Sequence, residues 1–149
     1  MKTIRFFFLL LLLAGSIAAS AQRKPVILNH IAITVKNLEK SASFYRNLLQ
    51  LDTIPEPFKD GKHAWFRVGE HSQLHVIEAK GNYTTFKGNH ICFTIASMDN
   101  FIAALQKAKI PFESWEGKPG GITVRPDGVK QIYLQDPDGY WLEINDDRF

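Results

Sequence analysis

The sequence predicts an α+β fold made of two tandem βαβββ modules, whose strands form a curved mixed sheet with the helices on its outer face. Three observations support this prediction. A seven-residue segment occurs twice, a helical period of apolar residues follows each copy, and short strand-like segments follow each helical stretch. Repetition at a fixed spacing is the signature of a duplicated structural unit. The chain of 149 residues has the length of one domain.

The repeated segment reads Asn-His-Ile-Ala-Ile-Thr-Val at 29–35 and Asn-His-Ile-Cys-Phe-Thr-Ile at 89–95, with four of seven positions identical. In both copies β-branched residues alternate with small or polar ones, which predicts a strand. The two copies therefore begin the two modules, which we place at about 26–80 and about 88–147.

A helix is predicted after each repeated strand. Apolar residues recur at helical spacing from Leu38 to Leu51, and again from Met98 to Ala108. Ser97 is well placed to cap the second helix. The remaining strands are predicted at 53–58, 63–68 and 73–79 in the first module and at 111–116, 130–135 and 140–145 in the second.

The first residues are typical of a signal peptide. Two basic residues precede an apolar run from Phe6 to Ala14, and Ala19-Ser20-Ala21 is a small-x-small cleavage site. We therefore expect residues 1–21 to be removed and residues 22–149 to form a single exported domain, periplasmic or secreted. The apolar run is too short to cross a bilayer comfortably, so we expect no stable membrane anchor.

Charge gives no reason to expect a nucleic-acid partner. Without Lys2 and Arg5, 16 of the 18 basic residues remain against 15 acidic ones, so the mature chain is nearly neutral. The single cysteine, Cys92, cannot form an internal disulfide. We therefore expect the exported domain to be held together by its core, by a metal ion or by a partner.

Strand parity assigns the strand residues to two faces, because side chains alternate across a sheet. One face is apolar and packs under the helices, with Ile31, Phe66, Ile91 and Leu142 among its residues. The other, which we call the cup face, is polar and aromatic. Its residues are His30, Ala32, Thr34, His63, Trp65, Arg67, Gln73, His75, Ile77, His90, Cys92, Thr94, Gln131, Tyr133, Trp141, Glu143 and Asn145.

Four cup-face side chains occupy equivalent positions in the two modules. His30 corresponds to His90 in the first strand, and His75 corresponds to Glu143 in the last. Three imidazoles and one carboxylate form a ligand set for a divalent metal ion: Zn, Ni, Mn, Fe or Co. Any one of them alone is more often an ordinary polar residue, and their equivalence is what favours a metal site. Glu143, the only carboxylate, is also the expected catalytic base.

Four further cup-face residues are candidates for binding a substrate. Arg67 and Tyr133 are placed to hold an anionic group, and Trp65 and Trp141 to form aromatic walls. The alternatives are a surface ion pair for Arg67 and packing between the modules for the two tryptophans.

The pattern resembles the vicinal-oxygen-chelate superfamily, also called the glyoxalase, bleomycin-resistance and extradiol-dioxygenase superfamily, from about Ile27 to Asp146. The most specific matches are Leu28-Asn29-His30-Ile31-Ala32, Ser43-Phe44-Tyr45 and Asp136-Pro137-Asp138-Gly139-Tyr140-Trp141-Leu142-Glu143. The resemblance implies metal ligands at His30, His75, His90 and Glu143. It also implies a small-molecule substrate bound through adjacent oxygens, and a homodimer whose site is built within one chain or from two swapped chains.

Two positions depart from named branches of that superfamily. Enzymes similar to glyoxalase I usually carry Glu where this chain has His75, and methylmalonyl-CoA epimerases tend to carry Gln. Fosfomycin-resistance enzymes resemble the set of His30, His90 and Glu143, but Ala32 stands where they need a hydroxyl residue. Extradiol dioxygenases use two histidines and one glutamate, and a fourth protein ligand would crowd the positions that O₂ needs.

The function expected from this resemblance is that of a metal-dependent lyase or isomerase of glyoxalase type, acting on a small oxygenated metabolite. The alternatives are a non-catalytic binding protein of bleomycin-resistance type and a dioxygenase. The intact ligand set favours an enzyme, because binding-only members often lose the metal residues.

Overall fold

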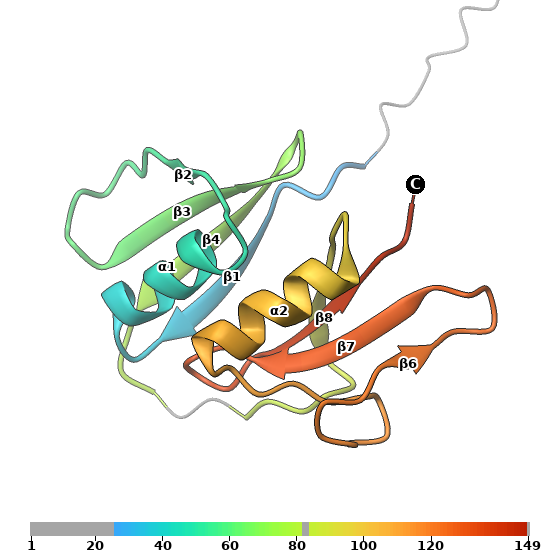
Figure 1. Cartoon of the computed structure of the whole chain (residues 1–149). Coiled ribbons are helices and arrows are strands. Elements are labelled where there is room, and N and C mark those ends of the chain that lie inside the picture. The colour runs from blue at the N-terminus through green and yellow to red at the C-terminus, as the bar shows by residue number, and fades with distance from the viewer. Residues whose placement is uncertain (1–25, 82–83, 149) are drawn as a thin grey trace, which may run out of the picture.

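The protein is described by a computed structural model that covers residues 26–81 and 84–148, and the expected signal peptide lies outside these residues. Figure 1 shows two successive units of the same construction. The first contains β1 (His30–Val35), α1 (Leu38–Asn47), β2 (Thr53–Ile54), β3 (His63–Val68) and β4 (Ser72–Glu78). The second contains β5 (His90–Thr94), α2 (Met98–Ala108), β6 (Thr123–Val124), β7 (Lys130–Gln135) and β8 (Trp141–Asn145). The predicted α+β class and the tandem βαβββ modules are confirmed.

Each module has its own four-stranded mixed sheet, with the orders β1-β4-β3-β2 and β5-β8-β7-β6. The first strand of each module runs parallel to the last, and the other pairings are antiparallel. Both sheets therefore end at the first strand of their module. The outer edges of β1 and β5 pair with no other strand in the described part of the chain.

The core lies between each sheet and its helix, as strand parity predicts. Ile33, Phe66 and Leu74 are buried in the first module, and Leu142 and Ile144 in the second. In Figure 1, α1 lies over the first sheet and α2 over the second. The cup-face residues lie on the opposite face of each sheet, which no helix of the described residues covers. No helix among the described residues is both long and apolar enough to cross a membrane.

Side-chain caps begin both helices. The Asn37 side chain accepts a hydrogen bond from the Lys40 N–H (2.8 Å), and Ser97, the predicted cap of α2, accepts one from the Asn100 N–H (3.3 Å). The helix α2 ends at Ala108 because Lys109 adopts a left-handed conformation with φ of 55°.

The strand predicted at 111–116 is wrong. In that segment only Glu113 forms isolated bridges, with Tyr133 and Pro119, and the fourth strand of the sheet is β6 instead. The segment folds back on itself: the Gly120 N–H donates to the Phe112 carbonyl and the Ser114 N–H to the Lys118 carbonyl. These local bonds use backbone groups that a strand would give to its neighbour.

The two modules are joined where the turn between β7 and β8 packs against α1. The Tyr45 hydroxyl donates to Asp136 (2.7 Å), and Asp138 accepts from the Ser41 hydroxyl (2.6 Å) and the Lys36 N–H (2.8 Å). Burial raises the pKa of Asp136, although its hydrogen bonds act in the opposite direction. Burial and the adjacent Asp136 carboxylate strongly raise the pKa of Tyr45. This polar joint therefore holds the two modules together.

Candidate metal and substrate site

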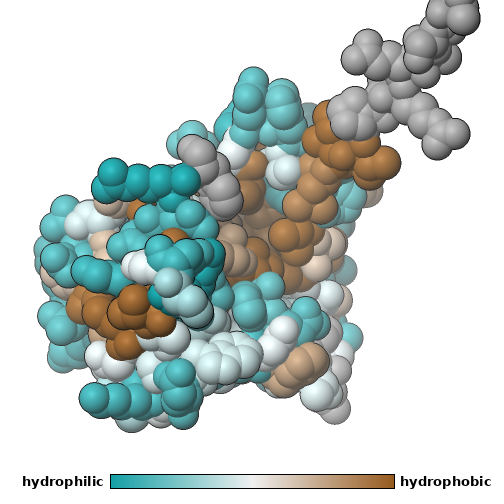
Figure 2. All heavy atoms as spheres, turned by 90° about the vertical axis from the view of Figure 1, so that its right-hand side faces the viewer, coloured by the Kyte–Doolittle hydropathy of each residue, from teal (hydrophilic) through white to brown (hydrophobic). Residues whose placement is uncertain are grey.

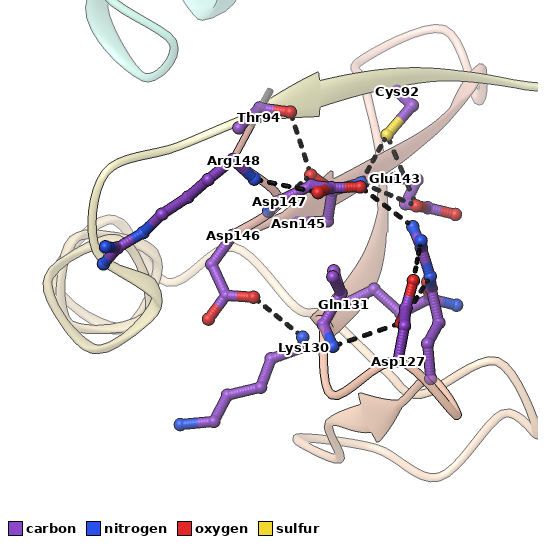
Figure 3. A network of polar contacts seen from close by, with 12 residues as sticks. Cys92, Thr94, Asp127, Lys130, Gln131, Glu143, Asn145, Asp146, Asp147 and Arg148 are labelled. Carbon is purple, nitrogen blue, oxygen red and sulfur yellow. Dashed lines mark hydrogen bonds and ion pairs between the residues drawn. The ribbon is translucent and has the colours of Figure 1, made fainter.

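In the second module, Glu143 is held at the centre of a hydrogen-bonded group. Strand register places Tyr133, Glu143 and Cys92 in one row across β7, β8 and β5. The Tyr133 hydroxyl donates to Glu143 Oε2 (2.5 Å), while the Asn145 amide (3.2 Å) and the Cys92 thiol (3.3 Å) donate to Oε1. Figure 3 shows Glu143, Cys92 and Asn145 pointing toward one another. Gln131 in turn donates to the Tyr133 hydroxyl (2.7 Å).

These contacts keep Glu143 ionised although it is only 8% exposed. Burial alone would raise the pKa of its carboxyl group. The hydrogen bonds from Tyr133, Cys92 and Asn145, together with the charge of His90, outweigh burial and lower this pKa. Burial and the Glu143 carboxylate raise the pKa of Cys92 to about 12, so the thiol remains a hydrogen-bond donor. The second module thus presents a fixed, negatively charged ligand.

His90 directs its other ring nitrogen toward that carboxylate. Its Nδ1 lies 2.8 Å from the Lys87 carbonyl oxygen and its Nε2 lies 3.2 Å from Glu143 Oε2. Because a carbonyl only accepts, Nδ1 carries a proton. Nε2 then faces a carboxylate oxygen, a contact that is favourable with a proton or a cation between the two atoms. A metal ion with bonds of about 2.0–2.2 Å to each atom fits such a separation.

In the first module, His75 is enclosed by two aromatic rings. The Trp65 ring is stacked on one face, with centroids 3.9 Å apart, and the His30 ring on the other, with centroids 4.2 Å apart. His75 Nε2 lies 2.8 Å from Gln73 Oε1, so this nitrogen donates and Nδ1 keeps the lone pair. Burial, followed by the charges of His30 and His63, lowers the pKa of His75. The ring is therefore kept neutral, the form that binds a metal ion.

The four predicted ligands form two pairs. His30 and His75 stack in the first module, and His90 and Glu143 face each other in the second. Within residues 26–81 and 84–148, no three His, Cys, Asp or Glu side chains lie together as a group that could hold a metal ion. Each module therefore supplies half of the predicted ligand set, and its assembly into one metal centre stays a prediction.

The predicted substrate residues lie in different surroundings. Tyr133 is buried beside Glu143, and its hydroxyl supports that carboxylate. The Lys87 amine lies over the Trp141 ring, 4.9 Å from its centroid. Arg67 is exposed on β3, and its guanidinium pairs with no carboxylate among the described residues. The ion pair considered as an alternative for Arg67 is thus not formed with any of these residues.

Sequence reasoning missed two residues near the site. Phe58 lies in the loop before β3 and is 60% exposed, although its ring stacks on His63. Lys87 fixes the orientation of His90 through its carbonyl oxygen. Phe58 falls within the strand predicted at 53–58, but β2 ends at Ile54 and Phe58 lies in the loop that follows. Lys87 also lies in a loop, where strand parity assigns no face.

Two cavities differ in their relation to these residues. A groove of about 650 Å³ lies between α1 and α2, with Phe44, Leu48 and Ala104 in its lining, and it contains none of the predicted site residues. A smaller cavity of about 200 Å³ is lined by Tyr133 and Trp141. The smaller one lies beside the polar group around Glu143 and is the more relevant to the chemistry.

The comparisons with known proteins identify the family of the chain. The model of the glyoxalase/bleomycin resistance protein/dioxygenase superfamily matches residues 27–144. The chain belongs to this superfamily. A metallothiol transferase FosB of Staphylococcus haemolyticus (strain JCSC1435) is 30% identical over 135 residues, covering 79% of this chain and 81% of the relative. A lactoylglutathione lyase of Pseudomonas putida is 22% identical over 153 residues, covering 79% and 83%.

Solved structures confirm the fold. The oxidase ChaP-H2 matches with a TM-score of 0.71 at 23% identity, over 85% of this chain and 97% of that chain. The fosfomycin resistance protein FosX of Listeria monocytogenes matches with a TM-score of 0.67 at 21% identity, over 85% and 94%. The relatives named as enzymes support an enzyme of this superfamily in general.

Proposed function

We propose that this protein is a metal-dependent enzyme of glyoxalase type, a lyase or isomerase acting on a small oxygenated metabolite. The divalent metal ion is held by His30, His75, His90 and Glu143. The observation that carries the proposal is the arrangement of His90 Nε2 and Glu143 Oε2, two potential metal-ligand atoms 3.2 Å apart. Buried charge of this kind is retained where a cation compensates it.

We propose further that the metal centre is completed by a second copy of the chain, one copy giving the pair of His30 and His75 and the other the pair of His90 and Glu143. The outer edges of β1 and β5, which pair with no strand of the described residues, support this arrangement. Val26, Ile27 and Leu28, just before β1, are each at least 59% exposed. Figure 2 shows apolar surface gathered where the described chain begins. Such apolar surface is commonly covered by a partner.

The metal ion would polarise the substrate oxygens that it binds. The protein's own residues have separate tasks. Arg67, with no carboxylate partner among the described residues, attracts an anionic group of the substrate. Glu143 accepts the substrate proton, and the hydrogen bonds from Cys92 and Asn145 to Oε1 keep the carboxylate in position.

Metal analysis tests the ligand set. Protein purified from its natural compartment should contain about one divalent metal ion per chain, and metal should raise the melting temperature by mass action. The His90→Ala variant should lose both the metal and the stabilisation. A variant that kept full metal content and the same melting shift would remove His90 from the set.

Complementation tests whether the site is shared between copies. The variants His30→Ala and His90→Ala should each bind no metal alone. When the two are mixed and refolded together, heterodimers should recover one intact site, giving about a quarter of the wild-type metal content. A site built within one chain predicts no recovery, because each chain then carries one damaged ligand of its own site.

A second candidate function is the transfer of a thiol to a small electrophile. The similarity to metallothiol transferase FosB, at 30% identity over 135 residues, favours it. The measurement is thiol consumption by the metal-loaded protein with a panel of electrophilic substrates. Consumption of thiol in step with the electrophile supports transfer, whereas isomerisation of a thiol adduct without net consumption supports the glyoxalase-type reaction.

We propose that the protein acts outside the cytoplasm, in the periplasm or as a secreted protein. The basic and apolar N-terminal residues with the small-x-small site at Ala19-Ser20-Ala21 support export. The intact mass of protein from its native host should correspond to a chain that begins at Gln22. A mature chain that retains Met1 would contradict this route.

A further inference from the structure

The cup face of the first module carries a row of aromatic rings that extends beyond the predicted ligands. The rings of Trp65, His75 and His30 are parallel within 9°, with neighbouring centroids about 4 Å apart. Neighbouring strands are about 4.8 Å apart, so these rings stand upright on the sheet and are stacked along the direction across the strands. Their edges, rather than their faces, therefore point away from the sheet.

Phe58 closes this row at its outer end. Its ring stacks on His63 with centroids 4.5 Å apart and meets Trp65 edge to face at 6.2 Å and 78°. We call Phe58, His63 and Trp65 the aromatic wall. Phe58 is 60% exposed, so the ring contributes little to the core and keeps most of its surface in water. An apolar ring held in this way is available to a ligand.

The loop that carries Phe58 is fixed by hydrogen bonds to two carboxylates. Glu56 accepts from the backbone N–H groups of Phe58 (2.6 Å) and Lys59 (2.9 Å). Asp60 accepts from the Lys62 N–H (2.9 Å), and His63 Nδ1 lies 2.9 Å from the same oxygen. Since the loop is already ordered, a ligand that binds the exposed ring loses little conformational entropy of the protein.

A cation lies beside the row, two residues from Trp65 on β3. Strand register places Arg67, Gln73 and His30 next to one another across β3, β4 and β1. Arg67 has no carboxylate partner among the described residues. A ligand whose oxygens reach the metal at His30 and His75 can therefore place a negative charge at Arg67 and its body toward the aromatic wall.

We propose that the substrate has a planar aromatic body with two adjacent oxygens and a negative charge, and that Phe58 determines this specificity. Aromatic ring edges carry partial positive charge and ring faces carry negative charge. A flat ligand lying across the upright rings makes edge-to-face contacts with them and packs its side against Phe58. An aliphatic metabolite with the same oxygens gains none of these contacts. This inference rests on the proposed metal-dependent function.

The test compares two probes with the same oxygens and charge, 3,4-dihydroxybenzoate and the aliphatic glycerate. Calorimetric titration of the metal-loaded protein, without oxygen, should give an affinity at least about tenfold higher for the aromatic probe. The Phe58→Ala substitution should weaken binding of the aromatic probe by about tenfold and leave the affinity for glycerate unchanged. Phe58→Leu, which keeps apolar bulk without a ring, should recover only part of the loss.

Phe86→Ala is the matched control, because Phe86 is 62% exposed in the linker and belongs to neither the wall nor the predicted ligand set. Its affinity for the aromatic probe should match the wild type. Equal affinities for both probes, or equal effects of Phe58→Ala and Phe86→Ala, would overturn the proposal.

The same titration of protein freed of metal by a chelator separates this inference from the proposed function. The aromatic probe should bind more weakly there but remain sensitive to Phe58→Ala. A wild-type protein that takes up no metal refutes the metal-dependent function, while the metal-free titration still decides whether the aromatic wall binds the probe.

Discussion

The two modules place different chemistry on the same backbone position. In the first, register aligns Trp65, His75 and Ala32 across the sheet, and in the second it aligns Tyr133, Glu143 and Cys92. His75 is held by ring stacking. Its counterpart Glu143 is held by hydrogen bonds from three side chains. The repeat has thus kept the positions of the predicted ligands while changing what surrounds them.

The difference follows from charge. A buried carboxylate needs hydrogen-bond donors, because an unpaired buried charge costs several kcal/mol. A neutral imidazole needs only cover for its faces and a partner for its N–H group. The second module therefore supplies the negative charge that attracts a metal ion, and the first supplies neutral ligands together with an aromatic surface.

The largest expected effect is on metal affinity, when Glu143 or His75 is replaced by neutral glutamine. Glu143→Gln should lower the affinity for a divalent metal by more than about 100-fold, because it removes the only negative charge of the predicted set. His75→Gln should lower it by only about tenfold, since a neutral ligand is replaced by a neutral polar group. Competition with a metal-chelating dye measures both affinities.

A suitable control for that comparison is Glu70→Gln, because Glu70 lies in an exposed turn away from both ligand pairs. Its metal affinity should equal that of the wild type. Equal losses in Glu143→Gln and His75→Gln would show that the two modules contribute equally to metal binding.

A second prediction concerns the joint between the modules. Tyr45→Phe removes the hydroxyl that donates to Asp136, which is only 6% exposed. Loss of one partner of a buried charged group should lower the free energy of unfolding by about 1–3 kcal/mol. Urea denaturation at neutral pH measures this change, and the metal affinity of the cup-face ligands should stay close to that of the wild type.

The pH dependence of Tyr45→Phe identifies the group responsible. The pKa of Tyr45 is raised in the folded protein, so above about pH 10 the unfolded chain loses a proton that the folded one keeps. The wild type therefore loses stability as the pH rises, by up to about 1.4 kcal/mol per pH unit from this group. The variant should lack this contribution. Identical alkaline slopes in the two proteins would assign the loss to another residue.

The repeat and the strand parity made most of the fold predictable. The two copies of Asn-His-Ile fixed where β1 and β5 begin, and alternation separated buried Phe66 and Leu74 from the cup face. The strand predicted at 111–116 pairs with β7 only through Glu113. The Phe112 carbonyl and the Ser114 N–H bond within the loop instead, and such local pairing leaves no periodic signal.

The candidate site was predictable by position but not by grouping. Parity placed His30, His75, His90 and Glu143 on one face of their sheets. It could not show that the residues form two pairs, since parity says nothing about how two sheets are oriented to each other. Phe58 was missed because the strand predicted at 53–58 ends at Ile54, and the contact of Phe58 with His63 is made from the following loop.

The smallest expected effect compares the caps of the two helices. Asn37 accepts from the Lys40 N–H at 2.8 Å, whereas Ser97 accepts from the Asn100 N–H at 3.3 Å. Asn37→Ala should lower the free energy of unfolding by about 1 kcal/mol, and Ser97→Ala by about half as much, because the longer hydrogen bond is weaker. Urea denaturation of both variants resolves this difference if the slopes against denaturant are unchanged.

The variant Ser97→Asp adds a negative charge at the helix N-terminus and should stabilise α2 by a few tenths of a kcal/mol. A larger loss from Ser97→Ala than from Asn37→Ala would show that α2 depends more on its cap than α1 does, and that the distances do not rank the two contacts.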